Sequence, residues 1–266
     1  MAMMGRVLCG SRRILDPRLL SLLAFLLLWA VGARLSGPEI LPGPLVVGAR
    51  VVEILRGHGG LEESAYFDFG VTLARILASS ALIMILGGAF GIAMGLSQRA
   101  EEIFEDLLVY WMALPVLLVV LLCTFWFGFN EFATTLATVV VLVPIAATNV
   151  WAATKTLNPD LSAMAKTFKV ARADTIRHIL LPQLYPVLFA TFRSIFGLSW
   201  KVVAIVEAFF LQVGVGAALS YWFERARLDL VLAWVGLFIV FILVIEHGII
   251  GPLEARLFGW RPQWRG

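Results

Sequence analysis

Long apolar segments separated by short polar connections make up most of the chain. A membrane-spanning helix needs about 20 mainly apolar residues, and six segments reach or approach that length. They lie at about 19–35, 72–96, 109–128, 132–153, 184–210 and 230–250. The pattern predicts an all-α integral membrane protein with about six transmembrane helices.

Composition supports this fold class. Of 266 residues, 61% are hydrophobic and 15% are charged, and the mean hydropathy is +0.91, whereas a soluble domain carries about 25% charged residues. The net charge of +3 could indicate nucleic-acid binding, but the basic residues lie beside apolar spans, where they set orientation. The two cysteines, Cys9 and Cys123, form no disulfide framework and no metal-ligand spacing.

The first apolar segment has two interpretations. Four arginines precede it, and a basic tail before a short apolar run is also the pattern of a secretory signal peptide. The same tail fits a cytoplasmic anchor. We expect residues 1–18 to form a cytoplasmic tail and residues 19–35 to form the first transmembrane helix.

Lys and Arg residues predict the orientation of the spans. Thirteen of the 21 lie in the tails and connections on one side, five lie on the other, and three lie in or at the edge of spans. The side with the excess is expected to be cytoplasmic. Both termini, the C-terminal tail 253–266 and the polar segment 154–183 are therefore expected in the cytoplasm.

Two connections are expected on the opposite side. The stretch 36–71 is rich in proline and glycine, with a short helix expected at 45–56. The stretch 211–229, which contains Gly214 and Gly216, is too short for two crossings. It could dip into the membrane as a re-entrant element, provided that protein buries its backbone.

Glycines and prolines mark positions of special geometry within the spans. Gly87, Gly91 and Gly95 share one helix face, where small residues let another helix approach closely. We expect packing within the bundle rather than a contact between two copies. Pro115 and Pro144 each remove a backbone hydrogen bond, and each can kink its helix.

Several charged or polar side chains lie in or near the last two spans. Charges at membrane depth usually pair, face the bundle interior or line a water-filled path, although a lysine or arginine can also snorkel to the interface. Lys201 and Glu207 are six residues apart and do not share a helix face. Glu246 and His247 could form a proton relay, but solvation or a contact with a neighbouring loop is the simpler expectation. The candidates for a translocation path are Arg193, Trp200, Lys201 and Glu207.

No phosphate-binding Gly-x-x-x-x-Gly-Lys-Ser/Thr stretch, serine elbow or metal-ligand cluster occurs in the sequence. The sequence therefore predicts a non-catalytic protein with no metal and no cofactor of its own. If this protein drives active transport, the energy has to come from a partner.

The basic segment 160–182 is the candidate contact for that partner. Pro159 and Asp160 are typical of a helix start, and apolar residues recur at helical spacing from Leu161 to Leu180. We expect two short helices, ended by prolines at which the fifth span begins. They could lie on lipid headgroups, or they could insert an apolar side chain into a groove of a partner.

The same segment resembles the EAA loop of ATP-binding-cassette importer permeases. That pattern is Glu-Ala-Ala, three residues, Gly, and then a spacer to Ile-x-Leu-Pro. Ala165, Ile179 and Leu181-Pro182 match it, whereas the Glu position holds Ala163 and the Gly position holds Lys169. The loop therefore resembles a divergent copy.

The resemblance extends over roughly residues 66–260 and is most similar to the nitrate/sulfonate/taurine subgroup. The matching motifs are Thr72-Leu73-Ala74-Arg75, Gly87 to Leu96, Leu114-Pro115 with Phe125-Trp126-Phe127-Gly128, Pro144 with Asn149, and Ser199-Trp200-Lys201 to Glu207 followed by Gly214-Val215-Gly216. Val150 stands where that subgroup has threonine. Each motif is modest, but their order and spacing are specific.

This resemblance implies a bacterial inner-membrane permease with a core at 72–252 and a coupling loop at 154–183. It implies a homodimer that binds two cytoplasmic ATPase subunits, which hold the ATP, and that receives a small solute from an extracytoplasmic binding protein. The solute would be an anion such as a sulfonate, taurine or nitrate. The implied ATPase-coupling residues are Ala163, Ala165, Lys166, Phe168, Lys169, Val170, Ala171, Leu181 and Pro182.

Two alternatives remain at this point. A stand-alone secondary transporter would need intramembrane carboxylates and inverted repeats, and Glu207 is the one central carboxylate among the spans. A membrane scaffold with a lipid-binding basic loop would not recruit an ATPase.

Overall fold

The computed structural model describes residues 17–58 and 64–258, and all the regular structure in these ranges is helical. The helices are α1 (Pro17–Ser36), α2 (Pro44–Leu55), α3 (Ala65–Leu96), α4 (Gln98–Met112), α5 (Val116–Phe127), α6 (Glu131–Lys155), α7 (Pro159–Thr167), α8 (Arg172–Thr175), α9 (Leu181–Phe210), α10 (Val215–Glu224), α11 (Leu228–Ile245) and α12 (Gly251–Phe258). Two five-residue π-helical turns, η1 (Ile176–Leu180) and η2 (Glu246–Ile250), join α8 to α9 and α11 to α12.

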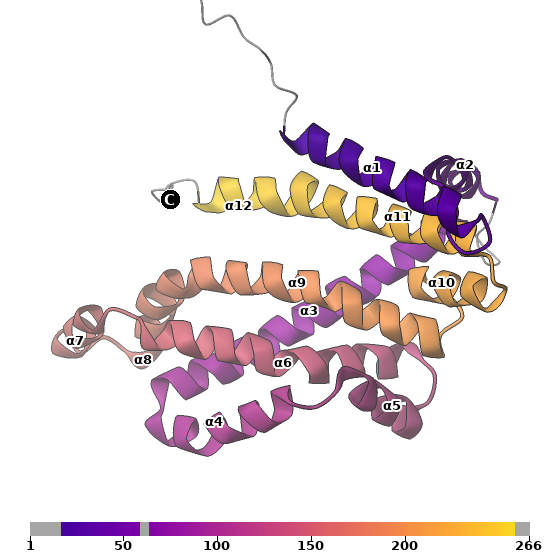
Figure 1. The fold of residues 1–266 in the computed structure, drawn as a ribbon. Coiled ribbons are helices and arrows are strands. Elements are labelled where there is room, and N and C mark those ends of the chain that lie inside the picture. Colours follow the sequence, from indigo (N-terminus) through magenta and orange to yellow (C-terminus); the bar gives the residue numbers. More distant parts are fainter. Residues whose placement is uncertain (1–16, 59–63, 259–266) are drawn as a thin grey trace, which may run out of the picture.

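Helices α3, α6 and α9 form the centre of the bundle (Figure 1). The most extensive contact is between α3 and α6, and α9 packs against both of them and against α10. Within residues 17–58 and 64–258, five helices are long and apolar enough to span a membrane, or six if the bent pair α4–α5 counts as one span. This agrees with the prediction of about six spans.

Glycines bring α3 and α6 together. A Cβ atom on Gly87 would lie 2.7 Å from Ala146 Cβ, and one on Gly91 would lie 2.4 Å from the carbonyl oxygen of Ala147. A Cβ atom on Gly95 would overlap Thr154. The glycine face is therefore buried in packing within the bundle, and this prediction is confirmed.

The expected third span, 109–128, is not one helix. Helix α4 ends at Met112, α5 begins at Val116, and their axes differ by 94°. Pro115 stands at the break, where it has no N–H group to continue the ladder and disfavours helical geometry in the residue before it. Pro144 has no such effect, because α6 runs unbroken from Glu131 to Lys155.

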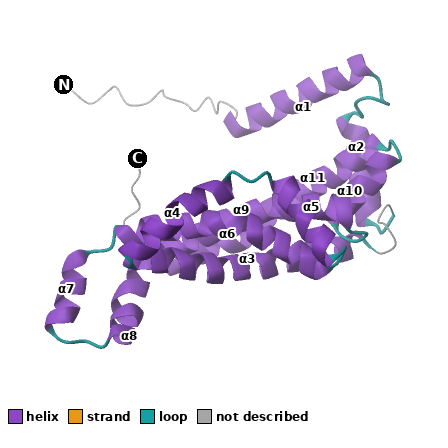
Figure 2. Ribbon diagram, turned by 90° about the horizontal axis from the view of Figure 1, so that it is seen from below, coloured by secondary structure: helices purple, strands orange, loops and turns teal. Residues whose placement is uncertain are grey.

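Helix α1 lies apart from the bundle (Figure 2). Its apolar residues, such as Leu27 and Leu28, are exposed, and its attachment is to α2, where the Trp29 indole donates to the Pro42 carbonyl at 3.1 Å. An isolated helix that is apolar on all sides is suited to lipid. The basic tail before it falls almost wholly outside the described residues.

The connections at the end of the bundle opposite α7 are ordered by packing and by ion pairs. The expected helix at 45–56 is α2, which packs on α11 through the Arg50–Asp229 ion pair at 2.7 Å. Hydrogen bonds to Glu53 and Asp229 raise the pKa of Arg50 above its ordinary value. The stretch 211–229 holds the short helix α10, whose residues 215–218 are buried, so protein covers this backbone as a re-entrant element requires.

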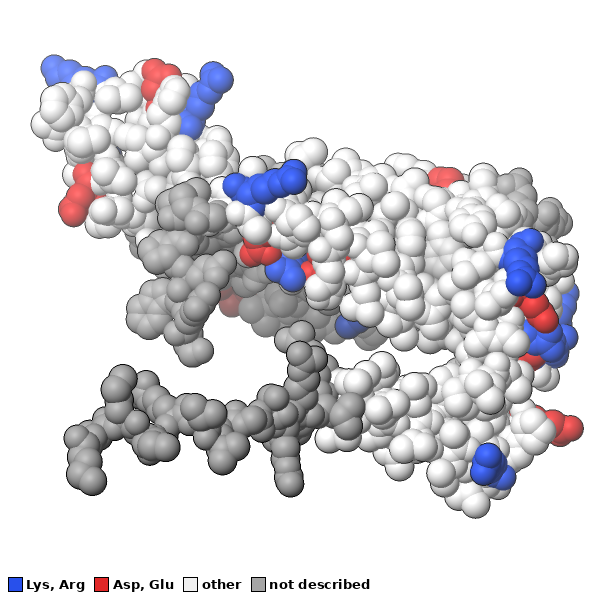
Figure 3. Space-filling model, turned by 90° about the horizontal axis from the view of Figure 1, so that it is seen from above, with Lys and Arg blue, Asp and Glu red and all other residues white. Residues whose placement is uncertain are grey.

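Charged side chains gather toward the two ends of the molecule, with a largely uncharged surface between them (Figure 3). This distribution matches a protein that crosses a bilayer along its long direction. The long axis of the bundle therefore follows the membrane normal.

The glycine face generates a stability prediction. Gly91→Ala should lower the free energy of unfolding by about 1–3 kcal/mol, because its new Cβ meets the backbone of α6, which cannot move aside without strain. The measurement is the thermal unfolding midpoint of the purified protein in one detergent. Gly70→Ala on the same helix is the matched control, because its Cβ meets nothing within 4 Å. Equal midpoints for the two variants would contradict the close packing of α3 on α6.

Candidate functional sites

The polar segment protrudes beyond one end of the bundle. Helices α7 and α8 extend away from the other helices, joined to each other by a short turn (Figure 2). The expected pair of short helices is present, but the second one is not separate, because α8, η1 and α9 form one continuous helical segment from Ala173 to Phe210. This segment turns near its start, so that α8 runs across the direction of the bundle (Figure 2). A displacement of this segment would therefore act directly on a membrane-spanning helix.

Local sequence explains both ends of α7. The Asn158 side chain caps the start by accepting from the Asp160 N–H at 2.9 Å, and Pro159 occupies the first turn. At the other end the Val170 N–H donates to the Ala165 carbonyl and the Lys169 N–H donates to the Lys166 carbonyl. This pair of bonds is a Schellman motif.

Lys169 has a left-handed backbone with φ of 52°. A Schellman motif needs this conformation just past the helix end, and glycine adopts it without steric cost. The family pattern has Gly at this position, so the structure gives a physical reason for it. Lys169 adopts the same left-handed conformation, and its side chain makes that conformation strained.

The surface of this segment carries an apolar side chain among basic ones. Phe168 is 75% exposed, and Met164 is also exposed beside Lys166 and Lys169. Of the other predicted coupling residues, Ala163, Val170, Ala171 and Pro182 are exposed and Leu181 is half-buried. Ala165 is 2% exposed and is packed within the segment, and the coupling role of all these residues stays a prediction.

A buried charge cluster lies at the opposite end of the bundle, centred on Glu207. The Glu207 side chain is 0% exposed and accepts from three groups: the Thr72 hydroxyl at 2.9 Å, Arg75 Nη1 at 2.7 Å and the Gly216 N–H at 2.9 Å. Arg75 also binds Glu131 through Nε at 2.7 Å and through Nη2. The cluster joins α3, α6, α9 and α10.

Backbone groups of the 211–216 connection complete this cluster. Arg75 Nη1 donates to the Val213 carbonyl at 2.7 Å, and the Val215 N–H donates to the Thr72 hydroxyl at 3.0 Å. Gly214 has φ of 120°, and a Cβ atom there would lie 2.5 Å from the Glu207 carboxyl carbon. A Cβ atom on Gly216 would lie 2.2 Å from the Ala204 carbonyl oxygen. Both glycines are required for the connection to close around the carboxylate.

Three of the four predicted path residues are engaged within the chain. Glu207 is the centre of the buried cluster. Trp200 is 2% exposed and stacks edge-on with Phe196, Phe238 and Phe241. Its wide indole fills the space between α9 and α11. Both residues are therefore packed inside one chain, and their assignment to a path stays a prediction.

Arg193 joins α9 to the C-terminal helices. Its guanidinium binds Glu246 of η2 and Glu254 of α12, each at 2.5 Å. Solvation or a contact with a neighbouring loop was expected for Glu246, whereas its partner is the helix α9. His247 contacts the Leu243 carbonyl of its own helix.

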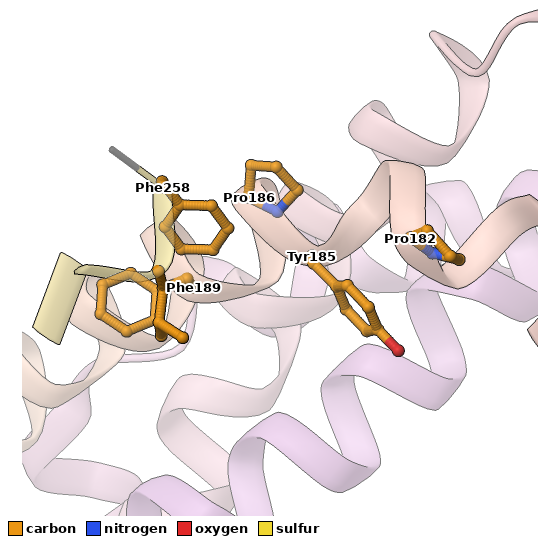
Figure 4. A pocket seen from close by; sticks show the side chains of 6 residues that line it. Pro182, Tyr185, Pro186, Phe189 and Phe258 are labelled. Carbon is orange, nitrogen blue, oxygen red and sulfur yellow. The ribbon is translucent and has the colours of Figure 1, made fainter. Parts of the chain in front are cut away.

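Beside this contact lies a cavity of about 370 Å³ between the start of α9 and the end of α12 (Figure 4). Its lining side chains are mainly apolar and include Pro182, Tyr185, Pro186, Phe189 and Phe258. The rings of Phe189 and Phe258 lie 5.4 Å apart. An apolar cavity offers nothing to neutralise a charged solute, so it is not a site for an anion.

Lys201 is the remaining path candidate. Its side chain is exposed, and it forms no ion pair or hydrogen bond with the described residues. A lysine at the centre of a lipid-exposed helix costs about 2.5–3.5 kcal/mol. A position facing water or another protein surface removes that cost.

Sequence reasoning missed the partners of Glu207. Thr72 and Arg75 were noted only as part of a motif that resembles the family, and neither they nor Glu131 were proposed as site residues. A usable signal exists, because an intramembrane Glu needs an intramembrane cation, and Arg75 is a basic residue buried in the second span. Nothing in the sequence indicates the contact with Glu131. That residue is the first of α6, and an acidic residue is common in the first turn of any helix.

The cluster generates a second prediction. Glu207→Ala should lower the free energy of unfolding by about 3–5 kcal/mol, because Arg75 would stay buried without its deepest partner. Glu131→Ala is the matched control; its side chain is 66% exposed, and we expect a loss of about 0–1 kcal/mol. Urea unfolding followed by tryptophan fluorescence measures both. Losses of similar size would show that Glu207 is not the centre of the cluster.

The left-handed turn generates a third prediction. Lys169→Gly should slow amide hydrogen exchange at residues 168–170, because relief of strain outweighs the added chain entropy by about 0.5–1 kcal/mol. Lys166→Gly, within α7, should change exchange in the opposite direction by a similar amount. The same sign for both substitutions would refute the role of the left-handed turn.

Comparisons with known proteins agree with this architecture. Residues 83–249 match the protein family described as "Binding-protein-dependent transport system inner membrane component". The chain is 25% identical over 233 residues to the taurine transport system permease protein TauC of Escherichia coli (strain K12), covering 87% of this chain and 84% of that protein.

Two further relatives come from Synechococcus elongatus. The bicarbonate transport system permease protein CmpB is 26% identical over 266 residues, covering 95% of this chain and 91% of that protein. The nitrate import permease protein NrtB is 25% identical over 212 residues, covering 75% of this chain and 74% of that protein.

Proposed function

The chain belongs to the family of binding-protein-dependent transport system inner membrane components, and on that premise we propose that it is the transmembrane subunit of an ATP-driven importer. It forms the path for a small anion such as a sulfonate, taurine or nitrate. Cytoplasmic ATPase subunits bind to the segment α7–α8. A solute-binding protein delivers the anion to the opposite end, and two copies of the chain form the permease.

One observation carries this proposal: the exposed Phe168 on a protruding, basic pair of helices. An aromatic side chain that is 75% exposed at the tip of a projection is suited to fill a groove of a soluble partner. Helices α7 and α8 extend sideways from one end of the bundle, clear of the other helices, where a soluble partner can reach them (Figure 2).

The continuous helix that contains α8 and α9 explains how a partner could act on the membrane-spanning helices. Motion of the ATPase subunits moves α7 and α8, and α9 transmits that motion to the cluster at Glu207. The π-helical turn η1 lies where the segment meets the span, and such turns locally weaken the hydrogen-bond ladder of a helix. ATP then shifts the population between two arrangements of the bundle.

The geometry of Glu207 bears on the secondary-transporter alternative. A carboxylate that couples proton or sodium flux has to be reached by the ion. Glu207 is fully buried and held by Thr72, Arg75 and Gly216. This arrangement favours a structural role, and the energy source is then external.

The test is co-purification of an ATPase subunit with tagged permease. Phe168→Asp should abolish the interaction, because a carboxylate placed in an apolar groove is desolvated without a partner. Phe168→Leu is the matched control and should retain it, since it keeps an apolar side chain at the same position.

Both variants should keep the thermal midpoint of the wild type, because Phe168 is outside the core. If wild type recruits no ATPase, or if Phe168→Asp recruits it as well as wild type, the coupling proposal fails.

A further inference from the structure

Lys201 lies at one end of an exposed strip along α9. Ala190, Ser194, Gly197 and Lys201 follow one another at spacings of four, three and four residues, which places them on one face of the helix. All four are exposed, whereas the residues that flank Lys201, Trp200 and Val202, are buried. The strip therefore consists of small side chains and one cation.

The space beside the strip is open. A Cβ atom built on Gly197, one helical turn from Lys201, would meet no atom within 4 Å. Lys201 is nine residues from the end of α9 at Phe210, about 13 Å along the helix. In a hydrocarbon core about 30 Å thick, this places its ammonium group near the middle.

Contact with lipid is energetically unfavourable for this strip, because it contains a lysine. Snorkelling serves lysines near the ends of spans, and Lys201 is not near an end. Glu207, the fully buried carboxylate of the same helix, lies on a different face and is already bound by Arg75. The ammonium group therefore has to face water or another protein surface within the membrane.

A two-fold dimer specifies further what has to surround the Lys201 ammonium group. If the strips of two copies face each other, symmetry places each Lys201 near its equivalent. Two ammonium groups close together in a medium of low dielectric constant repel strongly. They remain charged there when water and an anion occupy the space between them.

We propose that Lys201 and its symmetry equivalent form a mid-membrane binding site for a small anion, such as a sulfonate or an inorganic oxyanion, on the translocation path. This proposal rests on the proposed importer function, because it places the cargo between two copies of α9. Under this proposal, Lys201 is the residue that selects the solute by its charge within the membrane. Arg75 of the second span and Arg193 of the fifth are, by contrast, neutralised by carboxylates.

The test uses a thiol reporter beside the lysine. The native cysteines are replaced by Cys9→Ser and Cys123→Ala, and Gly197→Cys is introduced, because a side chain fits there without a clash. The permease–ATPase complex in proteoliposomes is treated with 2-sulfonatoethyl methanethiosulfonate, which is a small sulfonate, or with its trimethylammonium analogue. Rates are measured without nucleotide and after trapping with ATP and vanadate, and each is divided by the rate with a free thiol.

The expected result is a preference for the anion that depends on Lys201. In at least one of the two states Gly197→Cys should react, and the ratio of anionic to cationic rates should fall about tenfold when Lys201→Gln is added. Lys201→Arg should keep the ratio. Gly236→Cys on α11, which also has no atom within 4 Å of its Cβ, should react at least tenfold more slowly with both reagents.

Two results would overturn the proposal. One is a rate ratio that does not change with Lys201→Gln. The other is a Gly197→Cys thiol that reacts no faster than Gly236→Cys in both states. In either case an intact complex leaves the importer proposal standing, whereas failure of wild type to bind an ATPase contradicts the importer itself.

Discussion

The carboxylate of Glu207 has to be neutralised inside the bundle. The arrangement of helices at that end of the molecule depends on the groups that neutralise it. An isolated buried charge is far too costly to persist. Thr72 and Arg75 from α3 and the Gly216 N–H from α10 satisfy it, and the close fit of Gly214 leaves no room for water. Arg75 in turn binds Glu131, which fixes the start of α6. One carboxylate thereby joins four helices.

The two ends of the molecule consequently differ in how tightly their helices are held together. The end that holds Glu207 is tightly cross-linked, and the glycine face packs α3 directly on α6 along the bundle. The other end projects as α7 and α8, with an exposed Phe168 and few contacts to the bundle. Helix α9 joins these two ends and is continuous with α8, so a displacement of the projection reaches the cross-linked end without passing through a loop.

The spans, the glycine face and the projecting helices could be predicted from sequence, because length, hydropathy and spacing carry those features directly. The break at Pro115 was expected as a kink, but its 94° angle depends on how α4 and α5 pack and has no local signal. The burial of Trp200 could not be predicted from sequence, because an indole at membrane depth fits both a core and a path. The alignment with the family pattern pointed to Lys169 as a departure, and its positive φ explains why glycine belongs there. Two partners of Glu207, Thr72 and Arg75, lie more than 130 positions away in the sequence, and such pairings are decided by tertiary structure.

The most direct test of the account is hydrogen exchange of the permease with and without an ATPase subunit that co-purifies with it. ATPase binding should protect the amides of residues 159–170 strongly, while those of α10, at the far end, keep their exchange rates. Protection that spares α7, or that is confined to helices on the opposite side of the membrane, would contradict the claim that this segment receives the energy of ATP.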